Sequence, residues 1–87
     1  MEYVYILFSK KINRFYIGYT ADIETRMEFH KNPEKNKYTA KAKDWMLYLT
    51  IECQSKKQAL NIEHHIKRMK SKKYIENLKN ILKLFKN

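Results

Sequence analysis

The sequence predicts an α+β domain in which a three-stranded antiparallel sheet is flanked by helices, in the order ββαβαα. Three runs of aromatic and β-branched residues have the length of strands, at residues 3–8, 15–20 and 45–51. Elsewhere apolar residues recur with the period of a helix. The chain has 87 residues, 44% of them hydrophobic and 32% charged, so we expect one folded domain spanning residues 1–87.

The first two strands are predicted to form a hairpin. Residues 3–8 show no polar alternation, which is typical of a strand covered on both faces. Residues 9–14 are polar and include Asn13, a residue that favours turns. Strand character resumes at residues 15–20, so we expect these two strands to pair antiparallel.

The pattern changes to a helical period after the second strand. Ile23, Met27 and His30 follow one another at i, i+4 and i+7. Asp22 and Glu24 lie in the first turn, where the helix dipole favours acidic residues. This short helix is predicted to end before the proline at position 33.

The segment 31–44 contains the only proline and five lysines, which predicts an exposed loop. The apolar run Trp45–Ile51 then predicts the third strand.

Two further helices are predicted to follow the third strand. Ser55 and Gln58 form a capping-box pattern, in which the serine caps the helix and the glutamine bonds back to it. The apolar stripe of this helix is Ala59, Ile62, Ile66 and Met69. After a break near Ser71, a second stripe consists of Ile75, Leu78, Ile81, Leu82 and Phe85.

The chain is strongly basic. Nineteen Lys or Arg against nine Asp or Glu give a formal charge of +10, which favours binding to polyanions such as nucleic acid. Charge alone leaves ribosome association and anionic membrane surfaces open. The basic residues gather in two segments that could form two sides of a binding surface, namely Lys31, Lys35, Lys37, Lys41 and Lys43, and Lys67, Arg68, Lys70, Lys72 and Lys73.

Several common classes of protein are not expected. Cys53 is the only cysteine, so we predict a buried thiol with no internal disulfide and no thiolate metal site. His64 and His65 diverge by about 100° on a helix, so they cannot join Glu63 on one zinc ion. Gly18 is the only glycine, which excludes a glycine-rich phosphate loop. No apolar run approaches the roughly 20 residues of a membrane span, and we expect a cytoplasmic protein.

A few polar residues break the structural pattern. Glu63 lies within an apolar stripe, where an unpaired carboxylate is unfavourable, so it needs an ion pair, a set of hydrogen bonds or a metal ion. Arg26 and His30 share one side of the first predicted helix. Tyr5 and Tyr16 lie on the first two strands, where tyrosine is also a common packing residue.

Taken in order, these residues resemble the GIY-YIG nuclease superfamily. The resemblance rests on Tyr3-Val4-Tyr5, on Tyr16-Ile17-Gly18, and on Arg26, His30 and Glu63. The second motif is intact, whereas Tyr3 replaces the glycine and Val4 the isoleucine of the first. The match covers nearly the whole chain and is greatest to the small single-domain bacterial members.

The resemblance implies a metal-dependent endonuclease that hydrolyses DNA and leaves 5′-phosphate and 3′-hydroxyl ends. It implies that Glu63 binds one Mg²⁺ or Mn²⁺ ion and that Arg26 offsets charge in the transition state. Tyr5 and Tyr16 would hold or deprotonate the attacking water, with His30 assisting. Which tyrosine is the base stays open. Because the ordinary pKa of tyrosine is about 10, the base needs either a lowered pKa beside the cation and Arg26 or a proton relay to another group.

Other expectations follow from the resemblance and the charge. DNA is the expected substrate class, with RNA left open, and a protein partner or a homodimer could supply specificity. Functions in DNA repair, recombination or processing are associations of the family. The candidate nucleic-acid contacts are Lys37, Tyr38, Lys41, Lys43, Lys67, Lys70 and Asn77.

Two alternatives remain at this stage. The chain could be a nucleic-acid-binding module that keeps the fold with little or no catalysis. It could also be a basic structural or ribosome-associated protein in which Arg26 simply pairs with Glu63.

Overall fold

A three-stranded antiparallel sheet forms the centre of the protein, as the sequence predicts. The computed structural model describes the backbone of residues 1–31 and 41–85, and the side chains of residues 1–28 and 41–81. The strands are β1 (Glu2–Ser9), β2 (Arg14–Thr20) and β3 (Met46–Cys53), arranged in the order β2-β1-β3. The sequence of β1 lacks polar alternation because both of its faces are covered, with Val4 and Ile6 in one core and Tyr5 and Leu7 in the other.

The β1–β2 hairpin sets the register that the site depends on. Asn13 in its turn has a positive φ of 52°, a conformation that asparagine tolerates better than most residues. The pairing places Tyr5 directly opposite Gly18. Each strand extends beyond its predicted apolar run. The added residues are polar, apart from Cys53, and their backbones still pair with the neighbouring strand. Trp45, predicted to open the third strand, instead lies just before β3 and is buried.

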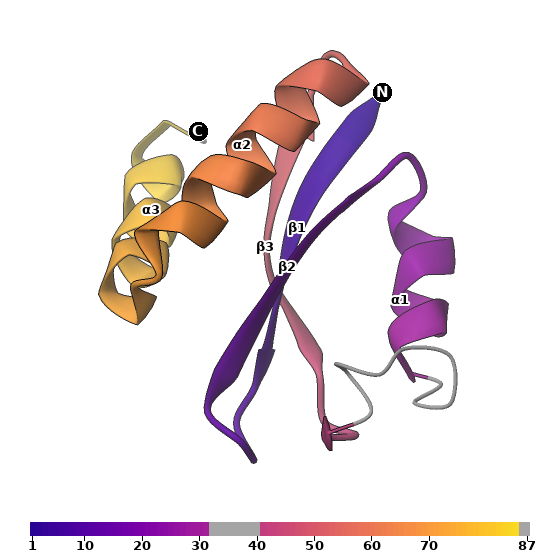
Figure 1. The fold of residues 1–87 in the computed structure, drawn as a ribbon, viewed down its shortest axis with the longest axis vertical. Helices are drawn as coiled ribbons and strands as arrows, with labels where there is room; N and C mark the ends of the chain where they lie inside the picture. The colour runs from indigo at the N-terminus through magenta and orange to yellow at the C-terminus, as the bar shows by residue number, and fades with distance from the viewer. Residues whose placement is uncertain (32–40, 86–87) are drawn as a thin grey trace.

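The three helices lie on both sides of the sheet. They are α1 (Ile23–Lys31), α2 (Lys56–Met69) and α3 (Lys72–Phe85). Figure 1 shows α1 on one side of the sheet, with α2 crossing the other side and α3 beside α2. Together with the strands, they confirm the predicted order ββαβαα.

Serine caps fix the starts of α2 and α3. The Gln58 N–H donates to Ser55 Oγ at 3.1 Å, as the capping pattern predicts. The Gln58 side chain, however, accepts from the Gln54 N–H at 2.7 Å rather than from the serine, because its length carries it one residue further back. Lys70 ends α2 in the left-handed conformation, and Ser71 accepts from the Tyr74 N–H at 3.1 Å at the start of α3.

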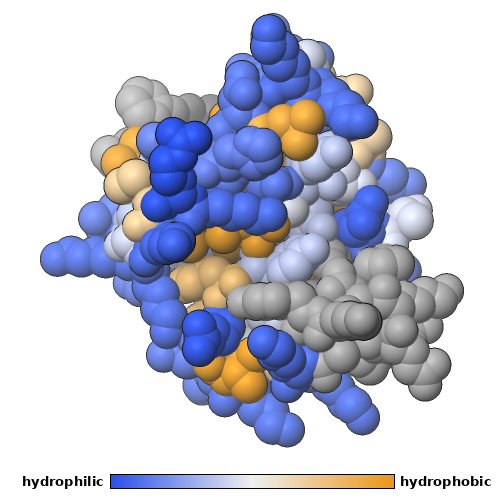
Figure 2. Space-filling model, viewed as in Figure 1, coloured by the Kyte–Doolittle hydropathy of each residue, from blue (hydrophilic) through white to orange (hydrophobic). Residues whose placement is uncertain are grey.

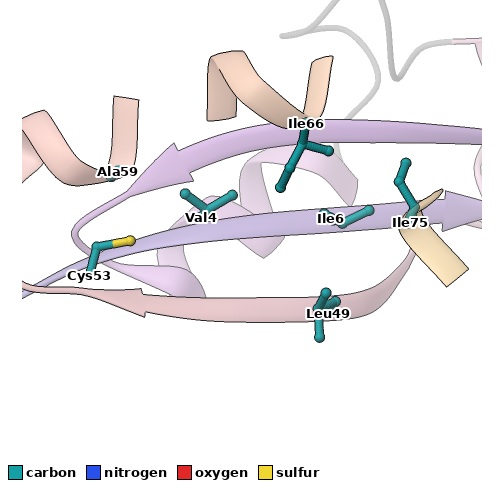
Figure 3. Packing of buried hydrophobic residues seen from close by; sticks show 7 residues of the cluster. All are labelled: Val4, Ile6, Leu49, Cys53, Ala59, Ile66 and Ile75. Atoms are coloured by element: carbon teal, nitrogen blue, oxygen red, sulfur yellow. The ribbon is translucent and has the colours of Figure 1, made fainter. Parts of the chain in front are cut away.

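Each face of the sheet has its own hydrophobic core. Figure 3 shows the larger one, between the sheet and the two later helices, which consists of Val4, Ile6, Leu49, Cys53, Ala59, Ile66 and Ile75. The other core lies on the α1 side and consists of Tyr5, Leu7, Ala42 and Trp45. Cys53 is buried and is a free thiol, which confirms the expectation for that residue.

Some predicted surfaces were wrong in detail. Met69 and Ile81 belong to the predicted apolar stripes but are 45% and 50% exposed. The segment 31–44 is not entirely an exposed loop, since α1 includes Lys31 and Ala42 is buried. Figure 2 shows the outer face as mostly hydrophilic, with small apolar areas between polar side chains.

A polar contact ties the β1–β2 hairpin to the chain that enters β3. The buried Ser9 hydroxyl donates to Asp44 Oδ1 at 2.6 Å, and the Lys11 N–H donates to Asp44 Oδ2 at 2.9 Å. These hydrogen bonds hold the pKa of Asp44 below its usual range. Among the described helices, none is long and apolar enough to cross a membrane.

Candidate active site

A cleft of about 750 Å³ runs along the edge strand β2 and collects residues from both sides of the sheet. It receives side chains from β1, β2, α1 and α2, because β2 is an edge strand that the helices of either face can reach. Four residues predicted to be catalytic line it, namely Tyr5, Tyr16, Arg26 and Glu63. The fold therefore brings these four residues together although they are far apart in the sequence.

The side chain of Tyr5 lies over the backbone of Gly18. Tyr5 is 2% exposed, and a Cβ built on Gly18 would lie 2.5 Å from its hydroxyl oxygen and 2.6 Å from its Cζ. Any residue other than glycine would displace the ring. Gly18 is therefore needed for close approach and not for an unusual backbone angle, since its φ is not positive. This contact gives a physical reason for a glycine two residues after Tyr16.

Tyr5 and Tyr16 form a pair with different environments. Their ring centroids are 6.2 Å apart. Burial is the main cause that raises the pKa of Tyr5 far above its ordinary value, and the neighbouring Tyr16 adds to the rise while Arg26 opposes it. The Tyr5 hydroxyl therefore stays protonated at neutral pH. Tyr16 is half-buried and also contacts Trp45, with ring centroids 6.5 Å apart.

The position of Arg26 is set by the cap of α1. Thr25 donates to Asp22 through both its N–H and its hydroxyl, at 3.2 Å and 2.7 Å. The Arg26 N–H donates to the Asp22 carbonyl at 3.1 Å, and the Thr20 hydroxyl also bonds to Asp22. These contacts attach the first turn of the helix to the end of β2. They direct Arg26 into the cleft as part of that turn.

Glu63 is held on the inner side of α2 and pairs with a lysine. It is 6% exposed, and its Oε1 lies 3.0 Å from Lys67 Nζ, four residues later on the same helix. Of the three partners that the sequence left open for Glu63, an ion pair is present, and it is formed with Lys67. The predicted alternative, a structural pair between Glu63 and Arg26, did not include this lysine.

The carboxylates of the cleft suit only an ion that keeps most of its water. Among the described residues, no group of three or more His, Cys, Asp or Glu side chains could hold a metal. Glu63 offers one carboxylate at a position where a cation is already stabilised. Glu2 lines the same cleft, and its Oε2 is buried with no hydrogen-bond partner. Such a donor set fits Mg²⁺ or Mn²⁺ with bound waters and does not fit a fully protein-ligated ion.

A second groove of about 470 Å³ adjoins the cleft and shares Tyr16, Ile17 and Lys67 with it. Its rim is basic and also carries Arg14, Lys70 and Lys72. Part of the second predicted lysine cluster therefore lies beside the candidate active site. A rim of this charge is suited to the phosphates of a nucleic-acid strand.

The remaining predicted residues fall outside the cleft or outside the described part of the chain. His30 belongs to α1, but its side chain lies outside the described residues. Lys37 and Tyr38 lie outside them as well. Lys41 and Lys43 are exposed before β3, and Asn77 is exposed on α3, and none of these three lines the cleft or the adjoining groove.

Sequence reasoning missed several residues that line the cleft. Glu2, Thr25 and Lys56 were not singled out, and Asp22 was assigned only to the helix start. Lys67 was expected to contact nucleic acid, but not to pair with Glu63. The spacing of Glu63 and Lys67, at i and i+4, is a signal that could have indicated this pair.

Comparison with known proteins yields a consistent family. The family model described as the GIY-YIG catalytic domain matches residues 1–77. A UPF0213 protein of Halalkalibacterium halodurans is 34% identical over 72 residues, which cover 83% of this chain and 76% of that relative. The UPF0213 protein YazA of Bacillus subtilis is 32% identical over 73 residues, covering 80% of this chain and 74% of the relative. No solved structure matches the chain.

Proposed function

Because the chain belongs to the GIY-YIG catalytic domain family, a family of nucleases, we propose that it is a metal-dependent endonuclease that hydrolyses phosphodiester bonds in DNA. The observation that supports this most is the meeting of Tyr5, Tyr16, Arg26 and Glu63 in one cleft, each from a different secondary-structure element. Packing alone does not require two tyrosines, a guanidinium and a buried carboxylate to share a solvent-filled cleft.

Glu63 would hold the divalent ion, with Glu2 in the same cleft. A bound Mg²⁺ or Mn²⁺ supplies stabilisation of negative charge on the leaving oxygen. Arg26 faces the same cleft as a fixed positive charge and would stabilise the pentavalent phosphate of the transition state. The reaction adds one water to phosphorus and breaks the bond to the 3′ oxygen, which leaves a 5′-phosphate and a 3′-hydroxyl.

The two tyrosines would have different tasks. The raised pKa of Tyr5 keeps its hydroxyl protonated, so it would donate a hydrogen bond and orient the attacking water or a phosphate oxygen. Tyr16 is the better candidate for accepting the proton of that water. Arg26 beside the pair favours an anionic oxygen in the site. His30 stays a predicted assistant in proton transfer.

The basic rim of the adjoining groove would bind the strand that leads away from the cut. Arg14, Lys70 and Lys72 line this groove and would contact phosphates there, which predicts that binding weakens as salt concentration rises. DNA stays the predicted substrate class, with RNA left open. A protein partner or a second copy that supplies specificity stays a prediction, as does a function in repair, recombination or processing.

Cleavage of end-labelled DNA tests the proposal. Single-stranded, duplex and forked substrates are incubated with Mg²⁺ or Mn²⁺, and with chelator, using the native protein and Glu63→Gln. Glu76→Gln is the matched control, because Glu76 is exposed on α3 and lies outside the cleft. We expect metal-dependent cutting that Glu63→Gln abolishes and Glu76→Gln leaves intact. Cutting that survives Glu63→Gln, in a variant that folds normally, would contradict the proposal.

One observation favours the alternative of a binding module without catalysis. Lys67 already neutralises Glu63, and a cleft arranged in this way could bind nucleic acid with no metal. In that case no substrate is cut under any metal condition, and salt-dependent binding is the same for the native protein and Glu63→Gln.

A further inference from the structure

The ion pair between Glu63 and Lys67 is uneven in a way that bears on metal binding. The Glu63 side chain is 8% exposed and is fixed by the packing of α2 against the sheet, whereas the Lys67 side chain is 52% exposed. The carboxylate therefore stays in place while the ammonium group can leave. Only the flexible stem of the lysine has to change its rotamer for the pair to open.

An ammonium group and a divalent ion compete at Glu63 in the arrangement observed. Lys67 Nζ lies 3.0 Å from Oε1 and donates a hydrogen bond to it, so it occupies one of the positions around the carboxylate that an ion could take and leaves Oε2. The two positive charges would also repel each other at such a short distance. Binding of an ion at Glu63 is consequently favoured when Lys67 moves away.

The groove beside the cleft offers a place for the displaced ammonium group. Lys67 lines both the cleft and this groove. The groove rim already carries Arg14, Lys70 and Lys72, so a further positive charge is unfavourable there unless an anion is present. A phosphate of a bound strand supplies that anion.

We propose that Lys67 couples metal binding to nucleic-acid binding by holding Glu63 in the free protein and moving to a phosphate of the substrate strand when both ligands are present. This inference rests on the proposed function and adds a form of regulation to the same site. Each ligand then favours the other by the same factor, since coupling between two binding sites is reciprocal. The free protein binds the ion weakly, and the substrate strand completes the site.

Binding of Mn²⁺, followed by electron paramagnetic resonance, tests the first half of the proposal without any cleavage. The variants are Lys67→Gln, Lys67→Arg and Glu63→Gln. The matched control is Lys56→Gln, because Lys56 lines the same cleft and its loss changes the net charge equally. Among the described residues, the hydrogen bond and the ion pair of Glu63 are formed with Lys67 and not with Lys56. Lys67→Met serves as a second neutral variant if Lys67→Gln does not fold.

We expect Lys67→Gln to bind Mn²⁺ about 5-fold more tightly or better, which is the lower end of typical couplings. Lys67→Arg should bind it as the native protein does, since a guanidinium group still competes for the carboxylate. Equal affinities of Lys67→Gln and Lys56→Gln would overturn the proposal and leave the nuclease function standing. Mn²⁺ binding that Glu63→Gln does not weaken would overturn both.

The second half concerns the substrate strand. Fluorescence anisotropy of labelled DNA is measured with and without Mn²⁺, in a Tyr16→Phe background chosen to prevent cleavage. Mn²⁺ should strengthen DNA binding in that background more when Lys67 is present than after Lys67→Gln. An equal effect of Mn²⁺ in both proteins would show that the metal acts only by general charge screening, and would overturn the coupling.

Discussion

The substitution Gly18→Ala tests the closest contact in the candidate site. The new Cβ would lie 2.5 Å from the Tyr5 hydroxyl oxygen, 2.6 Å from Cζ and 3.0 Å from Cε1. Ordinary contacts of carbon atoms are about 3.5–4.0 Å, so the ring must shift by roughly 1 Å. Tyr5 is 2% exposed and packs in the core on the α1 side of the sheet, so its ring is held by its neighbours. Overpacking of this kind costs about 1–3 kcal/mol.

A smaller effect of the opposite sign accompanies this cost. Alanine restricts the unfolded chain more than glycine does, which stabilises the native state by about 0.4–1 kcal/mol where the backbone is compatible. Gly18 has no positive φ, so this gain applies. The net loss in the free energy of unfolding is therefore about 0–2.6 kcal/mol, or a fall in Tm of up to roughly 20 °C for a domain of this size.

Urea denaturation of Gly18→Ala, Tyr5→Leu and the double variant checks this origin of the loss. In the Tyr5→Leu background the ring is absent, so Gly18→Ala should be neutral or stabilising, with a coupling of about 1–3 kcal/mol between the two sites. If Gly18→Ala changes the free energy of unfolding equally in both backgrounds, the close approach of Tyr5 to Gly18 is refuted. Cleavage of DNA should fall together with stability, since Tyr5 is displaced.

Three further predictions concern other contacts. Ser55→Ala removes the cap of α2 and should lower the unfolding free energy by about 1 kcal/mol, and an unchanged Tm would contradict the capping assignment. Asp44 has a pKa below its usual range because of the Ser9 hydroxyl, so its stabilisation is present above the unfolded pKa and is lost as pH falls through the folded one. Asp44→Asn should therefore flatten the decline in stability below about pH 4 in urea titrations, whereas an unaltered slope would count against this bond. Tyr16→Phe should reduce DNA cleavage about 100-fold or more, whereas Tyr5→Phe should lower the rate and keep its pH dependence, and the reverse pattern would exchange their proposed tasks.

The elements of the fold could be predicted from local sequence. The unbroken apolar run of β1 indicated a strand covered on both faces, and the two cores, which both include residues of β1, confirm this. The capping serine at position 55 marked the start of α2, and the break near Ser71 marked the start of α3. Both signals act between neighbouring residues, so the sequence displays them directly.

The ends of the elements and the exposure of their last turns were less predictable. Met69 has the right spacing for the apolar stripe of α2, but its side chain is 45% exposed. Ala42 lies in a segment rich in lysine and is nevertheless buried against Trp45 and Tyr5. Whether a side chain is covered depends on elements distant in sequence, which no local pattern reports.

For the candidate site, the sequence by itself determined the chemical inventory: two tyrosines on paired strands, an arginine in the first turn of a helix, and a glutamate in an apolar stripe, which together identify the family. Only the tertiary structure decided that these groups share one cleft, that Tyr5 lies against Gly18, and that Lys67 holds Glu63. Residue types and short-range spacing can be read directly from the sequence. Distances between groups on different elements arise only when the sheet register and the packing of the helices are fixed.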